Sequence, residues 1–359
     1  MLIKPFAHFI KNAFNIFCMS YKIGVVGATG AVGAEMIRVL HDRSFPVSEL
    51  HLFASERSAG SVIDTPFGEQ TIELFSVEAA REMDIVFLAV SGSFAKEHAP
   101  AIADQEGPST SSGQAPFVID NSSAFRYDDA IPLVVPEINA SVIGDAKLIA
   151  NPNCTTAIAA VALWPLHQVF GLKKVIVSTY QATSGGGQPA MDELREQSKN
   201  YLAGEEVTCD KFAYPIPFNL IPQIDVFQEN GYTKEEMKVT WETRKIFGLL
   251  ELPVSCTAVR IPTFRAHAES ITIETEKEIT PEAAREILAS AAGVELADDT
   301  ANNRYPMPLT STEKYDVEVG RIRQNIVFGD HGLDLFVCGD QILKGAALNA
   351  VQIAEVVVA

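Results

Sequence analysis

The apolar run Tyr21 to Val26 leads directly into the glycine-rich residues 27–33 (GATGAVG), and apolar residues at helical spacing follow. A strand, a glycine-rich turn and a helix in this order open a dinucleotide-binding unit. Its glycines let the backbone approach a pyrophosphate, and the helix N-terminus supplies amides for it. A plain tight turn is the alternative, which the flanking strand and helix disfavour. The residues expected to hold the cofactor are Gly27, Thr29, Gly30, Ala31, Val32 and Gly33.

The segments that follow indicate a parallel α/β sheet. Residues 50–54, 84–90 and 116–119 are short apolar runs, and helical or loop segments separate them. Alternation of strands and helices is typical of a doubly wound sheet. The small polar run 107–115 interrupts this pattern and is expected to be an exposed loop.

Beyond Cys154 the pattern of expected strands and helices changes to that of an α+β domain. Longer alternating strands are expected at 174–181, 256–261 and 269–274, and helices at 191–200 and 281–291. These segments lack repeated βαβ units, so they predict a second domain. The apolar run 344–358 has helical spacing and is expected to pack back on the first domain.

The residues after the second strand bear on the choice of nicotinamide cofactor. A carboxylate there holds the ribose 2′-OH of NAD, whereas an arginine accommodates the 2′-phosphate of NADP. Arg57 with Ser58 favours NADP, although Glu56 beside them keeps NAD open.

Cys154 lies in Asn153-Cys154-Thr155-Thr156, after Pro152 and before an alanine-rich apolar run. Proline disfavours helix at the preceding residue, so a helix is expected to begin near the cysteine. Free amides and the helix dipole at that point favour a thiolate, which makes Cys154 a candidate nucleophile. The alternative is a small buried cysteine that only packs.

The net charge of −18 argues against nucleic acid or an anionic membrane as a partner. The five cysteines are scattered, with neither a Cys-x-x-Cys pair nor a Cys/His cluster, which fits a reducing, cytoplasmic compartment and gives no metal site.

Residues 1–18 are basic, aromatic and free of acids, and they form either an amphipathic targeting segment or an extension upstream of a start at Met19. The extension, or a disordered leader, is favoured.

Together these segments resemble the aspartate-semialdehyde dehydrogenase family from Tyr21 to the C-terminus. The motifs that carry the resemblance are GATGAVG (27–33), ASERSAG (54–60), NSSAFR (121–126), VPEIN (135–139), NPNCTT (151–156), YQATSGGG (180–187), FNLIPQID (218–225), WETRKI (241–246), VRIPTFRAHAES (259–270), RYPMP (304–308), VGRIR (319–323) and KGAALNAVQIAE (344–355). The resemblance implies a Rossmann-type dinucleotide-binding domain plus an α+β catalytic and dimerisation domain. The expected domains are residues 19–153 with 343–359 for NADP, and residues 154–342 for catalysis and homodimer formation.

The family interconverts 4-aspartyl phosphate with aspartate 4-semialdehyde and phosphate, using NADP, in the biosynthesis of lysine, threonine, methionine and diaminopimelate. By resemblance, Cys154 is the nucleophile that forms a thioester, and His267 is its acid/base partner. An imidazole can take the thiol proton or protonate an oxyanion near neutral pH. A histidine by itself is more often a surface or core residue.

The remaining roles are also implied by the resemblance. Gln181 orients the intermediate, Arg126 and Lys245 bind phosphate, and Arg260 with Glu242 holds the α-carboxylate and α-amino group. Glu242 and Lys245 could instead form an ordinary surface pair three residues apart on a helix. The residues expected near the nicotinamide are Ser184, Gly185 and Gln341. Many family members carry Asn at the position of Gln341.

Two other functions remain open from the sequence. A related acyl-phosphate reductase, such as an N-acetylglutamyl-phosphate reductase or a glyceraldehyde-phosphate dehydrogenase, shares the chemistry but not the surrounding residues. A non-catalytic dinucleotide sensor is disfavoured because Cys154, His267, Gln181 and Arg260 are all present.

Overall fold

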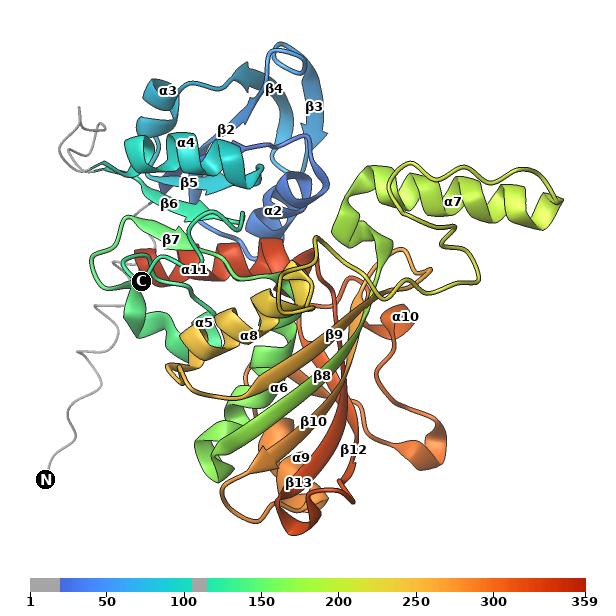
Figure 1. The fold of residues 1–359 in the computed structure, drawn as a ribbon. Coiled ribbons are helices and arrows are strands. Elements are labelled where there is room, and N and C mark those ends of the chain that lie inside the picture. The colour runs from blue at the N-terminus through green and yellow to red at the C-terminus, as the bar shows by residue number, and fades with distance from the viewer. Residues whose placement is uncertain (1–19, 105–114) are drawn as a thin grey trace, which may run out of the picture.

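The computed structural model describes residues 20–104 and 115–359, so the expected leader 1–18 and most of the polar run 107–115 lie outside the described residues. Within these residues, two separate sheets stand one above the other in the view of Figure 1. The first sheet has the strand order β3-β4-β2-β1-β5-β6-β7. Its pairs are parallel, except that β3 runs antiparallel to β4 at one edge. The α/β expectation for the first domain is therefore confirmed.

The strands of this sheet are β1 (Tyr21–Val26), β2 (Val47–Ala54), β3 (Val62–Thr65), β4 (Gly68–Leu74), β5 (Ile85–Leu88), β6 (Phe117–Asp120) and β7 (Leu148–Ala150). Its helical segments are α2 (Ala31–Asp42), α3 (Val77–Arg81), α4 (Gly92–Ala103), α5 (Pro136–Asn139) and η2 (Ala140–Ile143). All four residues of β5 are buried, as expected for a central strand with helices on both faces. The β3–β4 hairpin was not expected, because its residues are mostly exposed and show no apolar run.

The second sheet has six strands in the order β11-β12-β13-β10-β8-β9 among the described residues. These strands are β8 (Leu172–Gln181), β9 (Val254–Arg260), β10 (His267–Thr275), β11 (Val294–Leu296), β12 (Val317–Gln324) and β13 (Gly332–Gly339). Parallel and antiparallel pairs both occur, with β10 antiparallel to its neighbours β8 and β13 and β8 parallel to β9. This mixed sheet confirms the α+β expectation.

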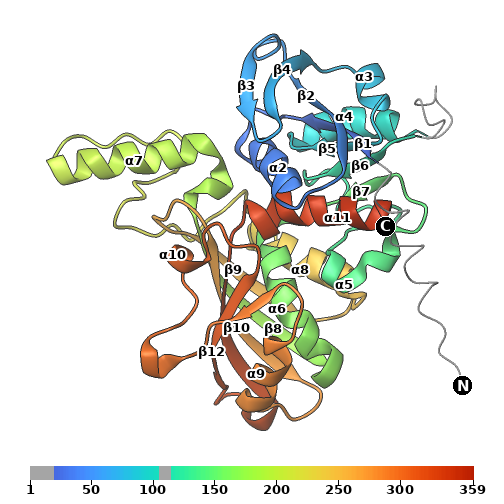
Figure 2. The same ribbon diagram turned by 180° about the vertical axis from the view of Figure 1, so that it is seen from behind.

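Three helices cover one face of the second sheet: α6 (Cys154–Phe170), α8 (Lys234–Phe247) and α9 (Pro281–Ala289). Their apolar side chains share one core with those of the sheet, including Leu163, Val239, Leu288, Val177 and Leu335. Seen from behind, α6 and α9 lie in front of the sheet (Figure 2). The layer of helices places the beginning of α6 at the junction with the first sheet.

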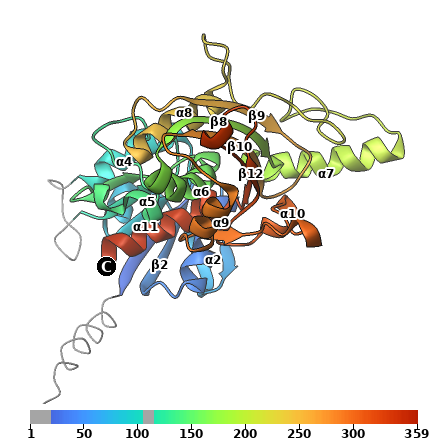
Figure 3. The same cartoon turned by 90° about the horizontal axis from the view of Figure 1, so that it is seen from below.

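Helix α7 (Gln188–Ala203) projects from the body of the molecule, as Figures 1 and 3 show. Several large apolar side chains on α7 and on the segment after it are exposed, among them Tyr201, Leu202 and Phe218. The smaller helical segments of this half are η3 (Thr183–Gly186), η4 (Thr300–Asn302), α10 (Pro308–Ser311) and η5 (Gly329–His331).

The chain ends in a π-helical turn, η6 (Leu343–Ala347), that continues into α11 (Leu348–Val358). Leu343, Val351 and Ile353 belong to the same core as Ile23 and Val25 of the first sheet. The last residues of the chain therefore cover the sheet that the first described residues build. No helix within 20–104 or 115–359 has both the length and the apolar character required to cross a membrane.

Candidate active site

Cys154 is the first residue of α6. Asn153 caps the helix: its side-chain oxygen accepts the N–H groups of Thr155 at 3.1 Å and Thr156 at 3.3 Å. Gly345 of η6 packs against the cysteine so closely that a Cβ added there would lie 2.6 Å from Cys154 Cβ. The helix start and η6 thus fix the position of the sulfur.

The expectation that the helix start favours a thiolate is not met in the free chain. Burial and, to a smaller extent, the Glu235 carboxylate raise the pKa of Cys154 to about 11, although the Arg126 charge opposes them. Thr155 also lowers this pKa through its backbone N–H and its hydroxyl, but its N–H is shared with the Asn153 side chain and the effect is smaller than that of burial. Burial therefore favours the thiol form of Cys154 in this structure.

A cavity of about 300 Å³ opens at Cys154. Its lining comes from both halves of the chain. The lining residues are Val90, Gly92, Ser122, Ser123, Arg126, Asn153, Cys154, Gln181, Gly185, Ile224, Glu235, Lys238 and Arg260. Of the residues expected from the sequence, Arg126, Cys154, Gln181, Gly185 and Arg260 are brought together here.

The amide of Gln181, at the end of β8, connects the sheet to the cavity. It accepts a hydrogen bond from Thr179 Oγ1 at 3.0 Å and donates one to Glu235 Oε1 at 3.1 Å. Its side chain is therefore fixed in orientation beside the nucleophile. Arg260, at the end of the neighbouring strand β9, donates to the carbonyl of Ala182 at 2.5 Å.

His267 begins β10 and lies behind Gly185. Its Nδ1 accepts the N–H of Ala182 at 3.0 Å, so the proton of the neutral ring is on Nε2. Among the described residues Nε2 has no hydrogen-bond partner, and a Cβ on Gly185 would lie 3.3 Å from it. Burial, followed by the Arg260 charge, lowers the pKa of His267 to about 3. The ring is a neutral donor, so it is not placed to take the thiol proton at Nε2.

Glu242 and Lys245 are placed differently from the expectation, since neither is among the described residues that line the cavity. Lys245 Nζ donates to three backbone carbonyls, those of Arg126, Asp128 and Ile131, at 2.6–3.1 Å. All three N–H groups of the Lys245 ammonium therefore already donate to the backbone. Glu242 is fully buried and accepts the Asn153 N–H at 2.6 Å and Arg126 Nη1 at 3.2 Å. Both side chains support the cavity wall from outside.

Glu235 and Lys238 occupy the place in the cavity that was expected for Glu242 and Lys245. They repeat the same Glu-x-x-Lys spacing two turns earlier on α8. Lys238 Nζ pairs with Glu235 Oε2 at 2.9 Å, and Asn153 Nδ2 donates to Glu235 Oε1 at 3.0 Å. Burial opposes ionisation of Glu235, but Lys238 and these hydrogen bonds lower its pKa to about 2. The Thr233–Glu236 capping box could have located the start of this helix in the sequence, but not the turn that faces Cys154.

A second cavity of about 470 Å³ lies at the glycine-rich turn of the first domain. Its lining residues are Val26, Gly27, Thr29, Ala54, Ser55, Glu56, Leu74, Phe75, Val90, Ser91 and Phe94. Val90 borders both cavities, so the two adjoin.

The glycines of this turn fit a dinucleotide. Gly27 has φ +84°, and a Cβ there would lie 2.3 Å from the carbonyl oxygen of Ala89. A Cβ on Gly33 would lie 2.4 Å from the oxygen of Gly27, so helix and turn require both glycines. Gly30 is the N-cap residue of α2, and no side chain of the described residues caps the helix, which leaves the amides of the first turn for a pyrophosphate.

The other expected cofactor residues form two groups. Arg57 and Ser58 follow β2 in the turn beyond Ser55 and Glu56; the Arg57 side chain is exposed, and neither residue is in the lining of the cavity. Gln341 donates to Ser184 Oγ and accepts the N–H of Ala266 at 2.7 Å, beside His267.

Two family models match the chain: the semialdehyde dehydrogenase NAD-binding domain at residues 22–146 and the semialdehyde dehydrogenase dimerisation domain at residues 163–344. The aspartate-semialdehyde dehydrogenase of Aquifex aeolicus is 48% identical over 95% of this chain and 98% of its own length. The chain belongs to the aspartate-semialdehyde dehydrogenase family. The Bacillus subtilis member is 44% identical over 93% of this chain and 96% of its own. A crystal structure of aspartate semialdehyde dehydrogenase II from Vibrio cholerae, complexed with ASA, has a TM-score of 0.88 at 39% identity and covers 95% of this chain and 98% of that one.

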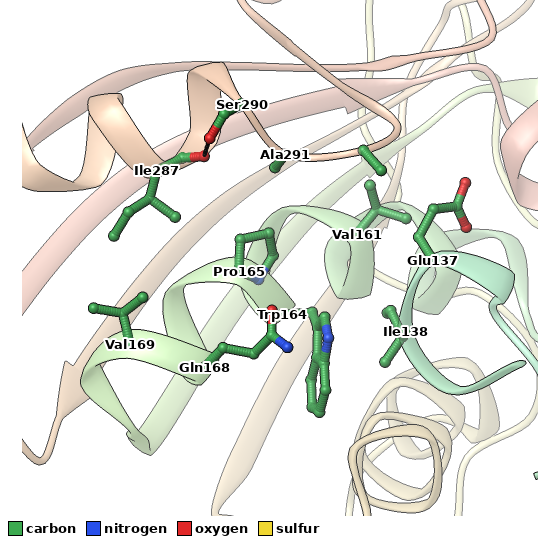
Figure 4. Close-up of a pocket in the computed structure, with 11 residues that line it drawn as sticks. Glu137, Ile138, Val161, Trp164, Pro165, Gln168, Val169, Ile287, Ser290 and Ala291 are labelled. Carbon is green, nitrogen blue, oxygen red and sulfur yellow. Dashed lines mark hydrogen bonds between the residues drawn. The ribbon is translucent and has the colours of Figure 1, made fainter. Parts of the chain in front are cut away.

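A further cavity of this family member, about 350 Å³, lies away from the glycine-rich turn, between α5, α6 and α9 (Figure 4). Trp164, Pro165 and Ile287 contribute apolar walls, and Glu137 is its carboxylate. That carboxylate already accepts hydrogen bonds from Lys344 at 2.5 Å and from Gln352 at 2.9 Å. The Glu137 carboxylate therefore already has hydrogen-bond donors from within the chain. Within residues 20–104 and 115–359, no cluster of His, Cys, Asp and Glu could hold a metal ion.

Proposed function

We propose that this chain catalyses the reversible, NADP-dependent reductive dephosphorylation of 4-aspartyl phosphate to aspartate 4-semialdehyde, through a thioester on Cys154. The observation that carries the proposal is the junction of two cavities at Val90, with the candidate nucleophile in one and the dinucleotide turn in the other. Such a junction brings a covalently held acyl group next to a nicotinamide.

The charges that line the Cys154 cavity suit the substrate. Aspartyl phosphate carries a phosphate, an α-carboxylate and an α-ammonium group. Among its described lining residues the cavity offers Arg126, Lys238 and Arg260 as cations and Glu235 as an anion. We assign the α-carboxylate to Arg260, since a guanidinium can bind it with two hydrogen bonds, and the α-ammonium to Glu235. Arg126 and Lys238 then remain for the phosphate.

Cys154 attacks the acyl carbon, the C–O bond to phosphate breaks, and the thiol proton leaves with the phosphate as HPO₄²⁻. This route needs no separate base, which agrees with a thiol of raised pKa and a histidine that has its proton on Nε2. Bound NADPH would supply the hydride that reduces the thioester. The Nε2–H of His267 donates a hydrogen bond to the oxyanion that forms, and the C–S bond then breaks to release the aldehyde and the thiolate. The thiolate takes one proton from solvent, which restores the Cys154 thiol for the next turnover. Gln181 holds the acyl group in position.

The cofactor is proposed to bind with its pyrophosphate on residues 27–33 and its nicotinamide near Ser184, Gly185 and Gln341. Arg57 and Ser58 are proposed to contact the 2′-phosphate from the turn beyond the cavity.

We further propose that residues 19–153 with 343–359 form the cofactor domain, that residues 154–342 form the catalytic domain, and that the protein is cytoplasmic. The exposed apolar residues of α7 and the match to a dimerisation domain support a homodimer.

The test is the phosphate-dependent reduction of NADP with aspartate semialdehyde, measured for the wild type and Cys154→Ala. We expect loss of turnover by at least about 1,000-fold, because covalent capture is removed, with the Kd for NADP unchanged. Cys209→Ala, at an exposed free cysteine, is the matched control and should retain full activity. Substantial turnover by Cys154→Ala would refute the thioester route, and preference for N-acetylglutamate semialdehyde would refute the substrate.

A further inference from the structure

Arg265 joins two distant parts of the chain immediately before His267. Its Nε donates to Asp340 Oδ2 at 2.6 Å, and its Nη2 donates to Glu35 Oε1 at 2.9 Å. The Arg265 side chain is one-fifth exposed and Asp340 is fully buried. Glu35 belongs to α2, the helix whose N-terminus is proposed to hold the pyrophosphate. One guanidinium therefore connects the cofactor helix to the segment after β13.

Asp340 in turn fixes the segment that packs on Cys154. Its Oδ1 accepts the N–H groups of Ile342 at 3.0 Å and Leu343 at 3.3 Å, at the start of η6. Gly345, two residues further, is the residue in van der Waals contact with the nucleophile. Loss of the Arg265–Asp340 pair would therefore allow η6 to move, and this movement would displace Cys154, against which Gly345 packs.

The backbone between Arg265 and His267 is held in an unfavourable conformation. Ala266 has φ +66°, a left-handed region that residues with a Cβ rarely adopt. Its N–H is held by Gln341 Oε1 at 2.7 Å, and its side chain is buried. Such a conformation persists when its surroundings fix it, and Arg265 anchors it on the N-terminal side.

We propose that Arg265 is a positioning residue that aligns His267 and Cys154 with the cofactor helix. Arg265 is not among the described residues that line either cavity. It acts on both reactive groups from behind, through Ala266 on one side and through Asp340 and η6 on the other. The inference rests on the roles proposed above for Cys154 and His267.

The test compares Arg265→Gln with Arg43→Gln in the full-length enzyme. Arg43 makes an equally close pair with Glu355, at 2.6 and 2.7 Å, and neither residue lines either cavity, so this pair serves as the matched control. For Arg265→Gln we expect kcat to fall by about 10- to 100-fold, as is typical when reacting groups are displaced by a fraction of an ångström to an ångström. The KM for aspartate semialdehyde and the Kd for NADP should stay within about threefold, because Arg265 touches neither ligand site. Arg43→Gln should leave all three unchanged.

Alkylation by iodoacetamide, mapped residue by residue, gives a readout that is independent of turnover. In Arg265→Gln we expect Cys154 to react several-fold faster, because η6 is released, while the buried Cys256 and Cys338 stay unreactive. Faster alkylation of all three cysteines would mean general loosening of the fold and would overturn the positioning role. A kcat within twofold of the wild type would overturn it as well.

Three more variants test the inference, and one of them, His267→Asn, separates it from the proposed function. Arg265→Lys should recover part of the lost kcat, since an ammonium can pair with one of the two carboxylates but not span both. Glu35→Gln added to Arg265→Gln should cause little further loss, because the contact is already broken. If His267→Asn keeps the wild-type kcat, the role proposed for His267 fails. If His267→Asn is inactive while Arg265→Gln is fully active, only the inference about Arg265 fails.

Discussion

Glu242 Oε2 accepts the backbone N–H of Asn153 at 2.6 Å, one residue before Cys154, while Glu242 Oε1 pairs with Arg126 Nη1 at 3.2 Å. One buried carboxylate thus holds both the helix cap next to the nucleophile and a cation of the cavity. Burial raises the pKa of Glu242, and the Arg126 charge opposes that shift. The residue supports the site from outside the cavity.

Replacement of Glu242 by Gln should therefore damage stability and turnover together. An uncompensated Arg126 remains buried, so we expect the free energy of unfolding to fall by about 3 kcal/mol. The kcat should fall by at least about tenfold as Cys154 and Arg126 shift. Urea unfolding and steady-state kinetics measure both effects. Unchanged stability would contradict the buried pair.

The two Glu-x-x-Lys pairs of α8 can be told apart with lysine variants. Lys238→Met should raise the KM for phosphate by at least about tenfold, a loss of about 1.4 kcal/mol of binding. Lys245→Met should leave that KM unchanged but lower the unfolding free energy by about 2 kcal/mol, because three carbonyls lose their donor. If Lys245→Met raises the KM for phosphate and Lys238→Met does not, Lys245 binds phosphate, as the sequence analysis expected.

Gly345→Ala tests how η6 holds the nucleophile. The added methyl group would lie 2.6 Å from Cys154 Cβ and 2.9 Å from its Cα, so the cysteine or the turn must move. We expect kcat to fall by about 100-fold, while NADP binding, measured by fluorescence titration, stays the same. Full activity in this variant would show that the turn relaxes without displacing the sulfur.

The raised pKa of Cys154 predicts the pH dependence of its alkylation in the free enzyme. Below its pKa of about 11 the thiolate fraction grows with pH, so the rate should rise about tenfold per pH unit between about pH 7 and 9. Rates of iodoacetamide labelling at Cys154 provide the measurement. A plateau near pH 7 would indicate a thiolate already present in the free chain.

His267 links stability to pH in the acid range. Its pKa is near 6.5 in the unfolded chain and about 3 when folded, so between these values the unfolded state binds the extra proton. Stability should therefore decrease as pH falls through that window, by up to about 1.4 kcal/mol per pH unit from this residue. His267→Gln should show a shallower slope between about pH 6 and 4 in urea unfolding. Equal slopes would indicate an accessible, ordinary histidine.

Local sequence signals predicted the class of both domains and the place of Cys154 at the start of a helix. The apolar run Tyr21 to Val26, the glycine turn and Pro152 act through short-range rules, and β1, α2 and the start of α6 appear where these rules put them. The hairpin β3–β4 was missed because its mostly exposed strands carry no apolar periodicity.

The errors in the site have tertiary causes. Two Glu-x-x-Lys pairs lie two turns apart on one face of α8, and only packing against α6 decides which of them reaches Cys154. The pKa of the thiol depends on burial and on Glu235, 81 residues away along the chain. No local pattern contains that information.

Helix α11 has a consequence for how the protein is made. The sheet built by the first described residues buries one of its faces under α2 and under the sixteen residues 343–358. During synthesis part of that face remains uncovered until residues 343–358 have left the ribosome, so the domain that is translated first completes its folding only after the second domain has been made.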